Sequence, residues 1–288
     1  MSNANVSALT ISVIIPTFNR THTLSRALDS IFKQAYAIHE IIVVDDGSQD
    51  AALDVQSKYP RVKFIQQSHL GVSAARNRGI RAATGDWIAL LDSDDTWSPR
   101  KLSRQTDAIV RQPDAILCHT NELWIRNGVR VNQMKKHQKK GGHIFQHCLP
   151  LCVISPSSVL IKKTLFEEIG YFDEKLPVCE DYDLWLRICA KYPVLYLDEC
   201  LIAKYGGHSD QLSRKYWGMD RFRVRALDKL IKTGAVKGND LAAAYEMLRH
   251  KCEILMKGAA KHNNQELLDD CQTIIKQHRL EAVEVTHA

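Results

Sequence analysis

Three short acidic clusters contain the side chains best suited to metal binding or proton transfer. The densest is Asp92-Ser-Asp94-Asp95, which places three carboxylates within four residues. Carboxylates this close repel one another unless a cation lies between them, and oxygen ligands favour Mg²⁺, Mn²⁺ or Ca²⁺ over softer metals. The cluster therefore predicts a divalent-metal site. The alternative, a turn that caps a helix, is weakened because Ser98-Pro99 already supplies an N-cap and a first helical residue.

A second acidic cluster, Glu180-Asp181-Tyr-Asp183, opens an expected helix. Helical spacing places Asp181 in line with the apolar stripe that contains Trp185. Desolvation there would raise the pKa of the carboxyl group and suit it to act as a general base, whereas the simpler alternative is an N-cap. Asp183 is expected on the solvent side, in a minor ion pair with Arg187.

Three other polar positions each have a functional and an ordinary interpretation. Asp46, in the third cluster, either contacts a ligand or bonds its own backbone in an Asp-Gly turn. Arg76 either reaches a phosphate or is simply solvated on its helix. His208 follows two glycines and is either a metal ligand or an ordinary surface or core histidine.

Alternating strands and helices over residues 10–112 must position these side chains. The strands expected there are apolar on both faces, which is typical of a parallel, Rossmann-like α/β sheet flanked by helices. Ligands on such sheets bind beyond the carboxyl ends of the strands, and three strands end there in polar residues: 16–20, 45–48 and 92–95. The expected strands are Ile11–Ile15, Ile41–Val44, Val62–Gln66 and Trp87–Leu91, and the helices are Thr21–Gln34, Ala51–Tyr59 and Gly71–Ala83.

The remainder of the chain is less regular. Asn127-Gly128 predicts a two-residue hairpin, and Lys135–Gly142 is a basic, glycine-ended loop. Beyond residue 215 the pattern is helical, so we expect a lead-in over residues 1–9, an α/β domain over 10–215 and a helical region over 216–288. Strands are also expected at 158–161, 195–197 and 201–205, and a helix at 180–191.

The composition is that of an ordinary globular protein: 288 residues, 45% hydrophobic and 25% charged. Eight cysteines without paired spacing, the lack of a signal peptide and the lack of a long apolar run predict a cytoplasmic protein. A net charge of +6 is compatible with an anionic ligand or an acidic membrane surface, and no nucleic-acid partner is expected. The basic, apolar segment Trp217–Lys232 either lies on the inner face of a membrane or packs on the α/β domain or on a second subunit of a homodimer.

Taken in order, the motifs over residues 10–214 resemble family 2 glycosyltransferases with the GT-A fold. Nothing transfers to the residues beyond 214. The motifs are Ile11–Arg20, Val44–Ser48, Gly71–Gly79, Gly85–Asp95, Glu180–Arg187 and, more weakly, His208–Ser213.

The resemblance implies an inverting enzyme that transfers a sugar from a nucleotide-diphosphate sugar, UDP-linked by family habit, to a carbohydrate or lipid-linked acceptor, as in bacterial surface polysaccharide synthesis. Asp181 matches the catalytic base. Asp94, with His208 near by, matches the site for Mn²⁺ or Mg²⁺. The donor-binding positions are Pro16, Thr17, Arg20, Asp46, Arg76 and Asp92, the last of which opens the family's DxD element.

Two other functions fit parts of the pattern. A nucleotidyltransferase that makes nucleotide sugars should carry a glycine-rich basic loop after the first strand, which Thr17–Arg20 lacks. A non-catalytic nucleotide-sugar-binding module would be favoured by the loss of Asp94 or Asp181, and both are present.

Overall fold

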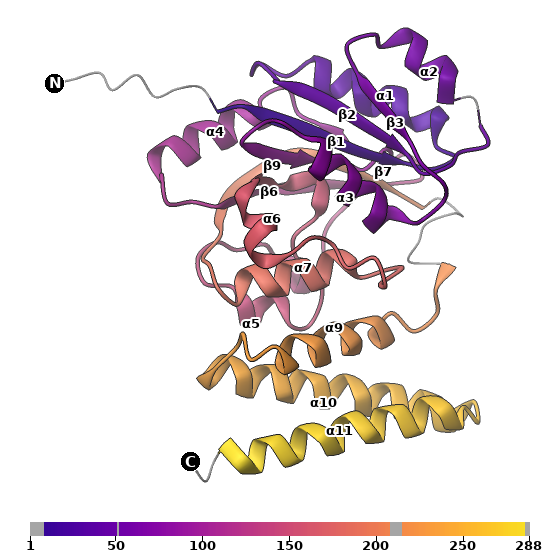
Figure 1. Cartoon of the computed structure of the whole chain (residues 1–288), viewed down its shortest axis with the longest axis vertical. Helices are drawn as coiled ribbons and strands as arrows, with labels where there is room; N and C mark the ends of the chain where they lie inside the picture. Colours follow the sequence, from indigo (N-terminus) through magenta and orange to yellow (C-terminus); the bar gives the residue numbers. More distant parts are fainter. Residues whose placement is uncertain (1–8, 51, 208–214, 286–288) are drawn as a thin grey trace, which may run out of the picture.

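The computed structural model describes residues 9–50, 52–207 and 215–285. A twisted sheet with helices on both faces forms the upper part of the molecule, and three long helices lie below it (Figure 1). The strands run in the order β3-β2-β1-β4-β8-β6-β9-β5, with β7 paired to β6. The first four strands are parallel: β1 (Ile11–Thr17), β2 (Glu40–Asp45), β3 (Lys63–Gln66) and β4 (Trp87–Leu90).

Strand β1 is buried on both faces because helices cover both sides of the parallel part of the sheet. Ile11, Val13 and Ile15 join one apolar cluster with α1, whereas Ile14 joins another cluster with α3. At Gly79 of α3 an added Cβ would lie only 2.4 Å from the Ile14 side chain, so this helix approaches the sheet as closely as its small residues predict. The helices here are α1 (Thr21–Phe32), α2 (Ala52–Lys58) and α3 (Val72–Ala82).

The second half of the sheet is mixed. β8 lies antiparallel between β4 and β6, while β9 runs parallel to β6 with irregular register between Thr120 and Glu122. The two short strands expected at 195–197 and 201–205 are therefore one irregular strand. The predicted α/β class is confirmed, and each antiparallel pair of strands within the described residues includes β5, β7 or β8. The strands are β5 (Thr96–Trp97), β6 (Leu117–Arg126), β7 (Val129–Val131), β8 (Leu160–Lys162) and β9 (Leu195–Gly206).

Short helices connect these strands. The hairpin at Asn127-Gly128 is confirmed: Arg126 pairs with Val129, and φ is +50° at Asn127 and +77° at Gly128. The expected helix at 180–191 is also present. The helices are α4 (Lys101–Arg111), α5 (Phe145–Cys148), α6 (Thr164–Ile169) and α7 (Glu180–Cys189), with 3₁₀ turns at Lys135–His137 and Pro156–Ser158.

The expectation that Ser98 caps the next helix is wrong. Helix α4 begins at Lys101, and no side chain caps it. Ser98 instead extends the pairing of β5, because its N–H donates to the Leu201 carbonyl at 2.8 Å.

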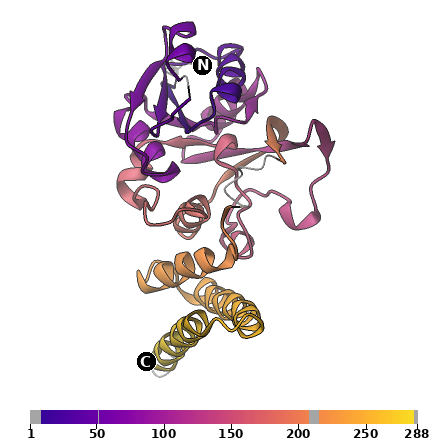
Figure 2. The same cartoon turned by 90° about the vertical axis from the view of Figure 1, so that its right-hand side faces the viewer.

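Helices α9 (Asp220–Lys232), α10 (Gly238–Lys261) and α11 (Gln265–Val285) stack as successive layers beneath the α/β part (Figure 2). Helix α9 lies against both α7 and α10. Its apolar side chains share one buried core with α7, which favours the packing interpretation of this segment over insertion into a membrane. No helix within the described ranges is both long and apolar enough to cross a membrane. The buried side chains of α9 are Phe222, Val224, Ala226, Leu227, Leu230 and Ile231.

Asp183 corrects a second expectation. Its side chain is 1% exposed, because α9 covers it. The ion pair with Arg187 is present at 2.9 Å, and Lys229 of α9 adds another at 2.6 Å. Asp183 therefore joins α7 to the C-terminal helices and does not face solvent.

Candidate active site

A cleft of about 1190 Å³ lies at the carboxyl ends of β1, β2 and β4. This volume is slightly above the range of about 300–1,000 Å³ that is usual for small-molecule sites in proteins, so the cleft is large enough for a nucleotide sugar. Segments from the second half of the chain form the opposite wall, and they include residues 174–177, 204–205 and 215–216. All the donor-binding positions expected from the sequence line this cleft, together with Asp94: Pro16, Thr17, Arg20, Asp46, Arg76 and Asp92.

Asp46 holds one wall of the cleft in place. Its carboxylate is buried and accepts four hydrogen bonds from the loop between β3 and α3. The donors are Gln67 Nε2 at 2.6 Å, His69 Nδ1 at 2.8 Å, Leu70 N at 3.0 Å and Gly71 N at 2.8 Å. Four donors fill the acceptor positions of a carboxylate. In this structure Asp46 therefore positions the loop that lines the cleft.

The alternative that Asp46 bonds its own turn is thus wrong, and the neighbouring carboxylate has that role. Asp45 accepts hydrogen bonds from the backbone N–H and the hydroxyl of Ser48. Beside this turn, the ring of Phe18 stacks on that of His69 with centroids 3.9 Å apart. Both rings line the cleft, and together they give it one aromatic edge.

Arg76 brings the two largest acidic clusters together. One guanidinium nitrogen lies 2.7 Å from Asp92, and another lies 2.6 Å from Glu180. The Arg76 side chain is only 5% exposed, so the alternative of a solvated arginine is wrong. Burial disfavours its charge, but the two carboxylates outweigh burial and raise the pKa of Arg76. Residues far apart in the chain thus meet at one wall of the cleft.

The carboxylates of this wall carry more negative charge than their partners offset. Burial and the charge of Asp92 raise the pKa of Asp94, although Arg20 lies 2.9 Å away. Burial and the charge of Asp181 raise the pKa of Glu180 to about 7, against the opposing effect of Arg76. A bound cation would relieve this repulsion.

Asp95 has a structural position within the same cluster. It is buried, and it accepts hydrogen bonds from Ser157 Oγ at 2.7 Å and from the Tyr205 N–H at 3.1 Å. Burial raises its pKa well above the usual value, although the charge of Lys204 opposes this. Asp95 therefore joins the end of β4 to β9 and to the 3₁₀ turn at Pro156–Ser158.

Asp181 lies in the first turn of α7 and is half-buried. The helix begins at Glu180, and its N-cap position is Cys179, with φ of +62°. Asp181 is therefore not the N-cap, and that alternative is wrong. Asp181 is not among the residues that line the cleft, but its charge raises the pKa of Lys204, which does line it.

The metal site expected from the sequence lies only partly within the described residues. His208 lies outside the described residues. Among the residues that are described, no group of three or more His, Cys, Asp or Glu side chains could hold a metal ion. Asp92 and Asp94 nevertheless fit a cation that arrives with its substrate, since Mg²⁺ is commonly bound by one or two carboxylates together with phosphate oxygens.

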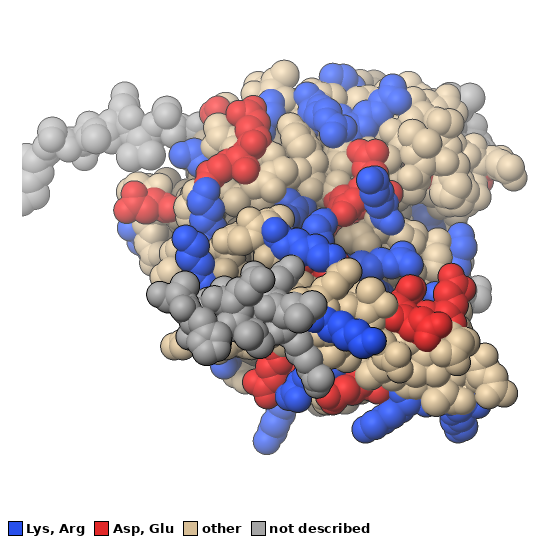
Figure 3. All heavy atoms as spheres, turned by 60° about the horizontal axis from the view of Figure 1, so that its bottom comes forward, with Lys and Arg blue, Asp and Glu red and all other residues tan. Residues whose placement is uncertain are grey.

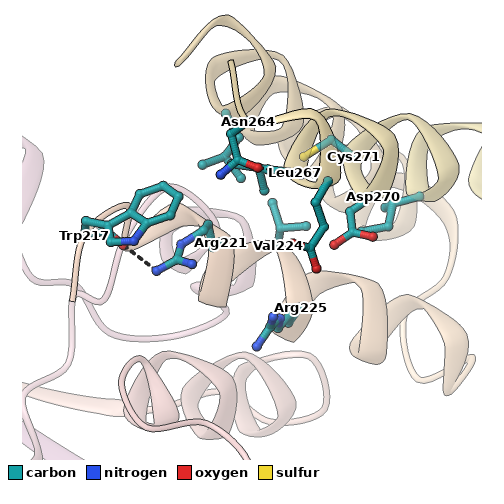
Figure 4. Close-up of a pocket in the computed structure, with 11 residues that line it drawn as sticks. Trp217, Arg221, Val224, Arg225, Asn264, Leu267, Asp270 and Cys271 are labelled. Atoms are coloured by element: carbon teal, nitrogen blue, oxygen red, sulfur yellow. Dashed lines mark hydrogen bonds between the residues drawn. The ribbon is translucent and has the colours of Figure 1, made fainter. Parts of the chain in front are cut away.

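A second cavity, of about 160 Å³, lies between the start of α9 and α11 (Figure 4). Arg221 stacks over the Trp217 ring at 3.6 Å and donates to the Trp217 carbonyl at 2.8 Å. The lining mixes apolar side chains with charges of both signs, such as Arg225 and Asp270. This volume is below the usual range for small-molecule sites, which leaves the larger cleft as the candidate active site.

Comparison with known proteins agrees with this geometry. The family model described as "Glycosyl transferase family 2" matches residues 12–170, which contain β1 to β4 and the carboxylates at their ends. The chain belongs to glycosyl transferase family 2. Membership in this family makes sugar transfer, rather than nucleotidyl transfer, the reaction to propose.

Three similar proteins place the chain within this family. An uncharacterised glycosyltransferase of Rickettsia felis is 32% identical over 73% of this chain, which spans 36% of that protein. The Escherichia coli protein WfgD, named as a UDP-Glc:α-D-GlcNAc-diphosphoundecaprenol β-1,3-glucosyltransferase, is 32% identical over 62% of this chain and 69% of its own length. The crystal structure of S. aureus TarS 1-349 in complex with UDP-GlcNAc has a TM-score of 0.67 and 21% identity, covering 84% of this chain and 71% of TarS 1-349, which establishes the shared fold.

Proposed function

We propose that this chain transfers a sugar from a nucleotide-diphosphate sugar to an acceptor hydroxyl, with inversion at the anomeric carbon. The observation that carries the proposal is the donor-sized cleft lined by Asp92 and Asp94, in which Arg76 joins Asp92 to Glu180 at the start of α7. A uridine nucleotide is the first donor to test. Its base would lie by the Phe18–His69 edge and its diphosphate by Asp94.

Asp181 is the proposed general base. Of the three carboxylates at the start of α7, Glu180 is held by Arg76, and Asp183 is closed off by Arg187 and Lys229. Asp181 is half-buried, and no ion pair within 4 Å joins it to a basic side chain of the described residues. It can therefore accept the proton of an acceptor hydroxyl as that oxygen attacks the sugar.

The attack displaces the nucleoside diphosphate in one step. A single displacement inverts the anomeric centre and needs no covalent enzyme intermediate, unlike retaining glycoside hydrolysis. Mn²⁺ or Mg²⁺ held by Asp94, with Asp92 and His208, would supply a Lewis acid for the departing diphosphate. Arg20 adds positive charge at the same edge of the sheet.

The proposed acceptor is a carbohydrate or a lipid-linked sugar, as in surface polysaccharide synthesis. WfgD, whose printed name specifies a diphosphoundecaprenol acceptor, supports this choice. Contact with a membrane surface and a homodimer are the further partners proposed.

Thermal unfolding in the presence of ligands tests the donor assignment. UDP, GDP, dTDP and their sugar conjugates are each added with Mn²⁺ or with EDTA. A bound ligand stabilises the fold by about 2.7 kcal/mol at 100 times its Kd, so we expect one nucleotide family to raise the Tm only with Mn²⁺. Release of free sugar from that donor would then show turnover. The proposal fails if no nucleotide changes the Tm, and binding without turnover by any acceptor would favour a non-catalytic binding module.

A further inference from the structure

The hairpin of β6 and β7 and the 3₁₀ turn that follows it form a strongly basic segment. Residues 126–140 contain six lysines and arginines and no acidic residue. Within the described residues, Lys139 is the one cation of this segment that has an acidic side chain within 4 Å, and its partner is Glu122. The other five cations are exposed, and they are Arg126, Arg130, Lys135, Lys136 and Lys140.

Buried contacts anchor this segment to the rest of the α/β domain. Lys139 Nζ lies 3.1 Å from Glu122 on β6 and donates to the Val153 carbonyl at 2.7 Å. Gly142 exchanges two backbone hydrogen bonds with Val194, of 2.7 and 3.0 Å. The basic, glycine-ended loop expected from the sequence is therefore tied down, so its exposed cations stand on an ordered backbone. Such order lowers the entropic cost of binding a ligand.

The hairpin shares a face of the sheet with Lys204, which lines the cleft. Trp124 of β6 pairs with Lys204 of β9, and because side chains alternate along a strand, Arg126 lies on that same face. The Arg126 guanidinium lies 5.6 Å from the centre of the Trp124 ring. The His137 ring packs edge-on against the same ring, with centres 5.0 Å apart. This contact places the 3₁₀ turn Lys135–His137 beside Arg126 and on the face that continues into the cleft.

Two exposed apolar side chains accompany these cations. Val129 is 64% exposed and Met134 is 57% exposed. Val129 pairs with Arg126 across the hairpin, so the two side chains are neighbours on one face. The hairpin projects from the side of the α/β part, where a ligand can reach it (Figure 2). Cations without acidic partners beside exposed apolar side chains suit a ligand that has both an anionic group and an apolar chain.

We propose that Arg126 and the 3₁₀ turn bind the diphosphate of a lipid-linked acceptor, while Val129 and Met134 contact the start of its apolar chain. Arginine and lysine bind phosphate oxygens through charge-assisted hydrogen bonds. The sugar on the other side of the diphosphate can then extend along the shared face toward the cleft. That the ligand is the acceptor rests on the proposed function, whereas the affinity of this surface for an alkyl diphosphate does not.

Binding measured without donor or metal tests the surface itself. The probe is N-acetylglucosamine joined through a diphosphate to a short alkyl chain, monomeric and in EDTA, and the neutral alkyl glycoside of the same sugar is compared with it. The variant Arg126→Ala/Lys135→Ala/Lys136→Ala should bind the diphosphate about tenfold more weakly than wild type, because three exposed cations are lost. Lys63→Ala, at an exposed position on β3 at the far edge of the sheet, is the matched control and should bind like wild type.

Equal affinity of wild type and the triple variant for the diphosphate would overturn the proposal. A wild type that binds the neutral glycoside as tightly as the diphosphate would overturn it as well. Added salt should weaken diphosphate binding by wild type more than by the triple variant, since exposed charges are screened. Binding to phosphatidylglycerol vesicles that is lost in the triple variant, without binding of the monomeric diphosphate, would assign the surface to a membrane instead.

Turnover separates this inference from the proposed function. With Mn²⁺ and the nucleotide sugar that raises the Tm, the triple variant should show a KM for the diphosphate acceptor raised about tenfold, and an unchanged KM for the donor and for the neutral glycoside. Equal losses with both acceptors would place the three cations outside acceptor binding and contradict the proposal. A wild type that binds the diphosphate but transfers no sugar would count against the proposed function, while the binding comparison would still decide the role of the surface.

Discussion

Asp181 and Asp183 lie two positions apart on α7, yet their surroundings differ completely. Asp183 is 1% exposed and lies between Arg187 and Lys229, so its charge is matched on both sides. Asp181 is half-buried near the cleft, where Lys204 faces it together with other carboxylates. The two sides of one helix thus serve two tasks. The side that faces α9 is ion-paired within the protein, and the other side carries the carboxylate proposed as the general base.

The same contrast distinguishes the cleft from the interface between α7 and the C-terminal helices. At the cleft, burial and a neighbouring carboxylate raise the pKa of Asp94 and that of Glu180. At α9, Asp220 and Asp228 have lowered pKa values, because hydrogen bonds and charges from basic neighbours outweigh burial. A bound cation would stabilise the ionised carboxylates at the cleft, whereas the matched charges at the interface hold helices together.

The largest effect should follow from Asp181→Asn. Asparagine keeps the size and most hydrogen bonds of the side chain but cannot accept the proton, so kcat should fall by about 10²- to 10⁴-fold. Donor affinity and Tm should stay near wild type. Initial-rate kinetics and thermal unfolding on the same preparation measure these quantities.

Asp183→Asn is the matched control, two residues further along α7. It should lose stability and retain the turnover of its folded fraction. Wild-type turnover in Asp181→Asn would move the base to another residue, and Glu180 is the next candidate because it lies beside Asp181 at the same wall.

Asp94→Ala should remove the Mn²⁺-dependent stabilisation by a nucleoside diphosphate. The side chain is 22% exposed at the edge of the sheet, so the fold should persist. Loss of one or two carboxylate ligands removes the charge that holds the cation. The measurement is the Tm in the presence of UDP, with and without Mn²⁺. The control is Asp114→Ala, at an exposed position outside the cleft. Equal manganese dependence in both variants would show that the metal assignment is wrong.

Lys229→Met tests the side of α7 that faces α9. It leaves Asp183 buried with Arg187 as its remaining partner, and loss of one partner from a buried pair is destabilising. We expect a loss of about 1–3 kcal/mol in the free energy of unfolding, below the full cost of an unpaired buried charge because Arg187 stays. Urea unfolding measures it, and Lys232→Met, whose partner Asp228 also pairs with His278, should cost less. A larger loss in Lys232→Met would contradict the importance of Asp183.

The sequence predicts the first half of the site well because its signals are local. Asp46, Asp92 and Asp94 directly follow apolar strands, and parallel strands bring their carboxyl ends to one edge. Which of these side chains forms which hydrogen bonds could not be predicted in this way. Which of Asp45 and Asp46 closes the turn depends on the loop at 67–71, which comes from a different part of the chain.

The residues that the second half of the chain contributes around the site lacked such a signal in the sequence. Glu122, Lys139 and Lys204 are single charged residues that are buried only because β6, β9 and the loop at 135–142 come together. One hint was available: Lys204 shares a strand face with Ile202, two residues earlier, and Ile202 is buried. Asp183 was misplaced for a similar reason, since helical periodicity on α7 cannot show that α9 covers its polar side.

The smallest expected effect concerns membrane binding by the C-terminal helices. The apolar side chains of α9 are buried, so contact with a membrane would depend on charge alone. Several of its cations are matched within the protein, including Arg223 with Asp220 and Lys229 with Asp173, and acidic and basic side chains are interspersed on the face seen in Figure 3.

We therefore expect weak sedimentation with phosphatidylglycerol vesicles at low salt only. Attraction between exposed charges is screened within about 8 Å at physiological ionic strength, so binding should disappear as salt is added. Deletion of residues 217–288 should abolish it and also cause aggregation, because the core that α7 shares with α9 becomes exposed. Vesicles of phosphatidylcholine are the control. Sedimentation that persists at high salt would require an exposed apolar surface and would contradict the buried packing of α9. If the protein does not sediment with vesicles at any salt concentration, packing is the sole role of these helices.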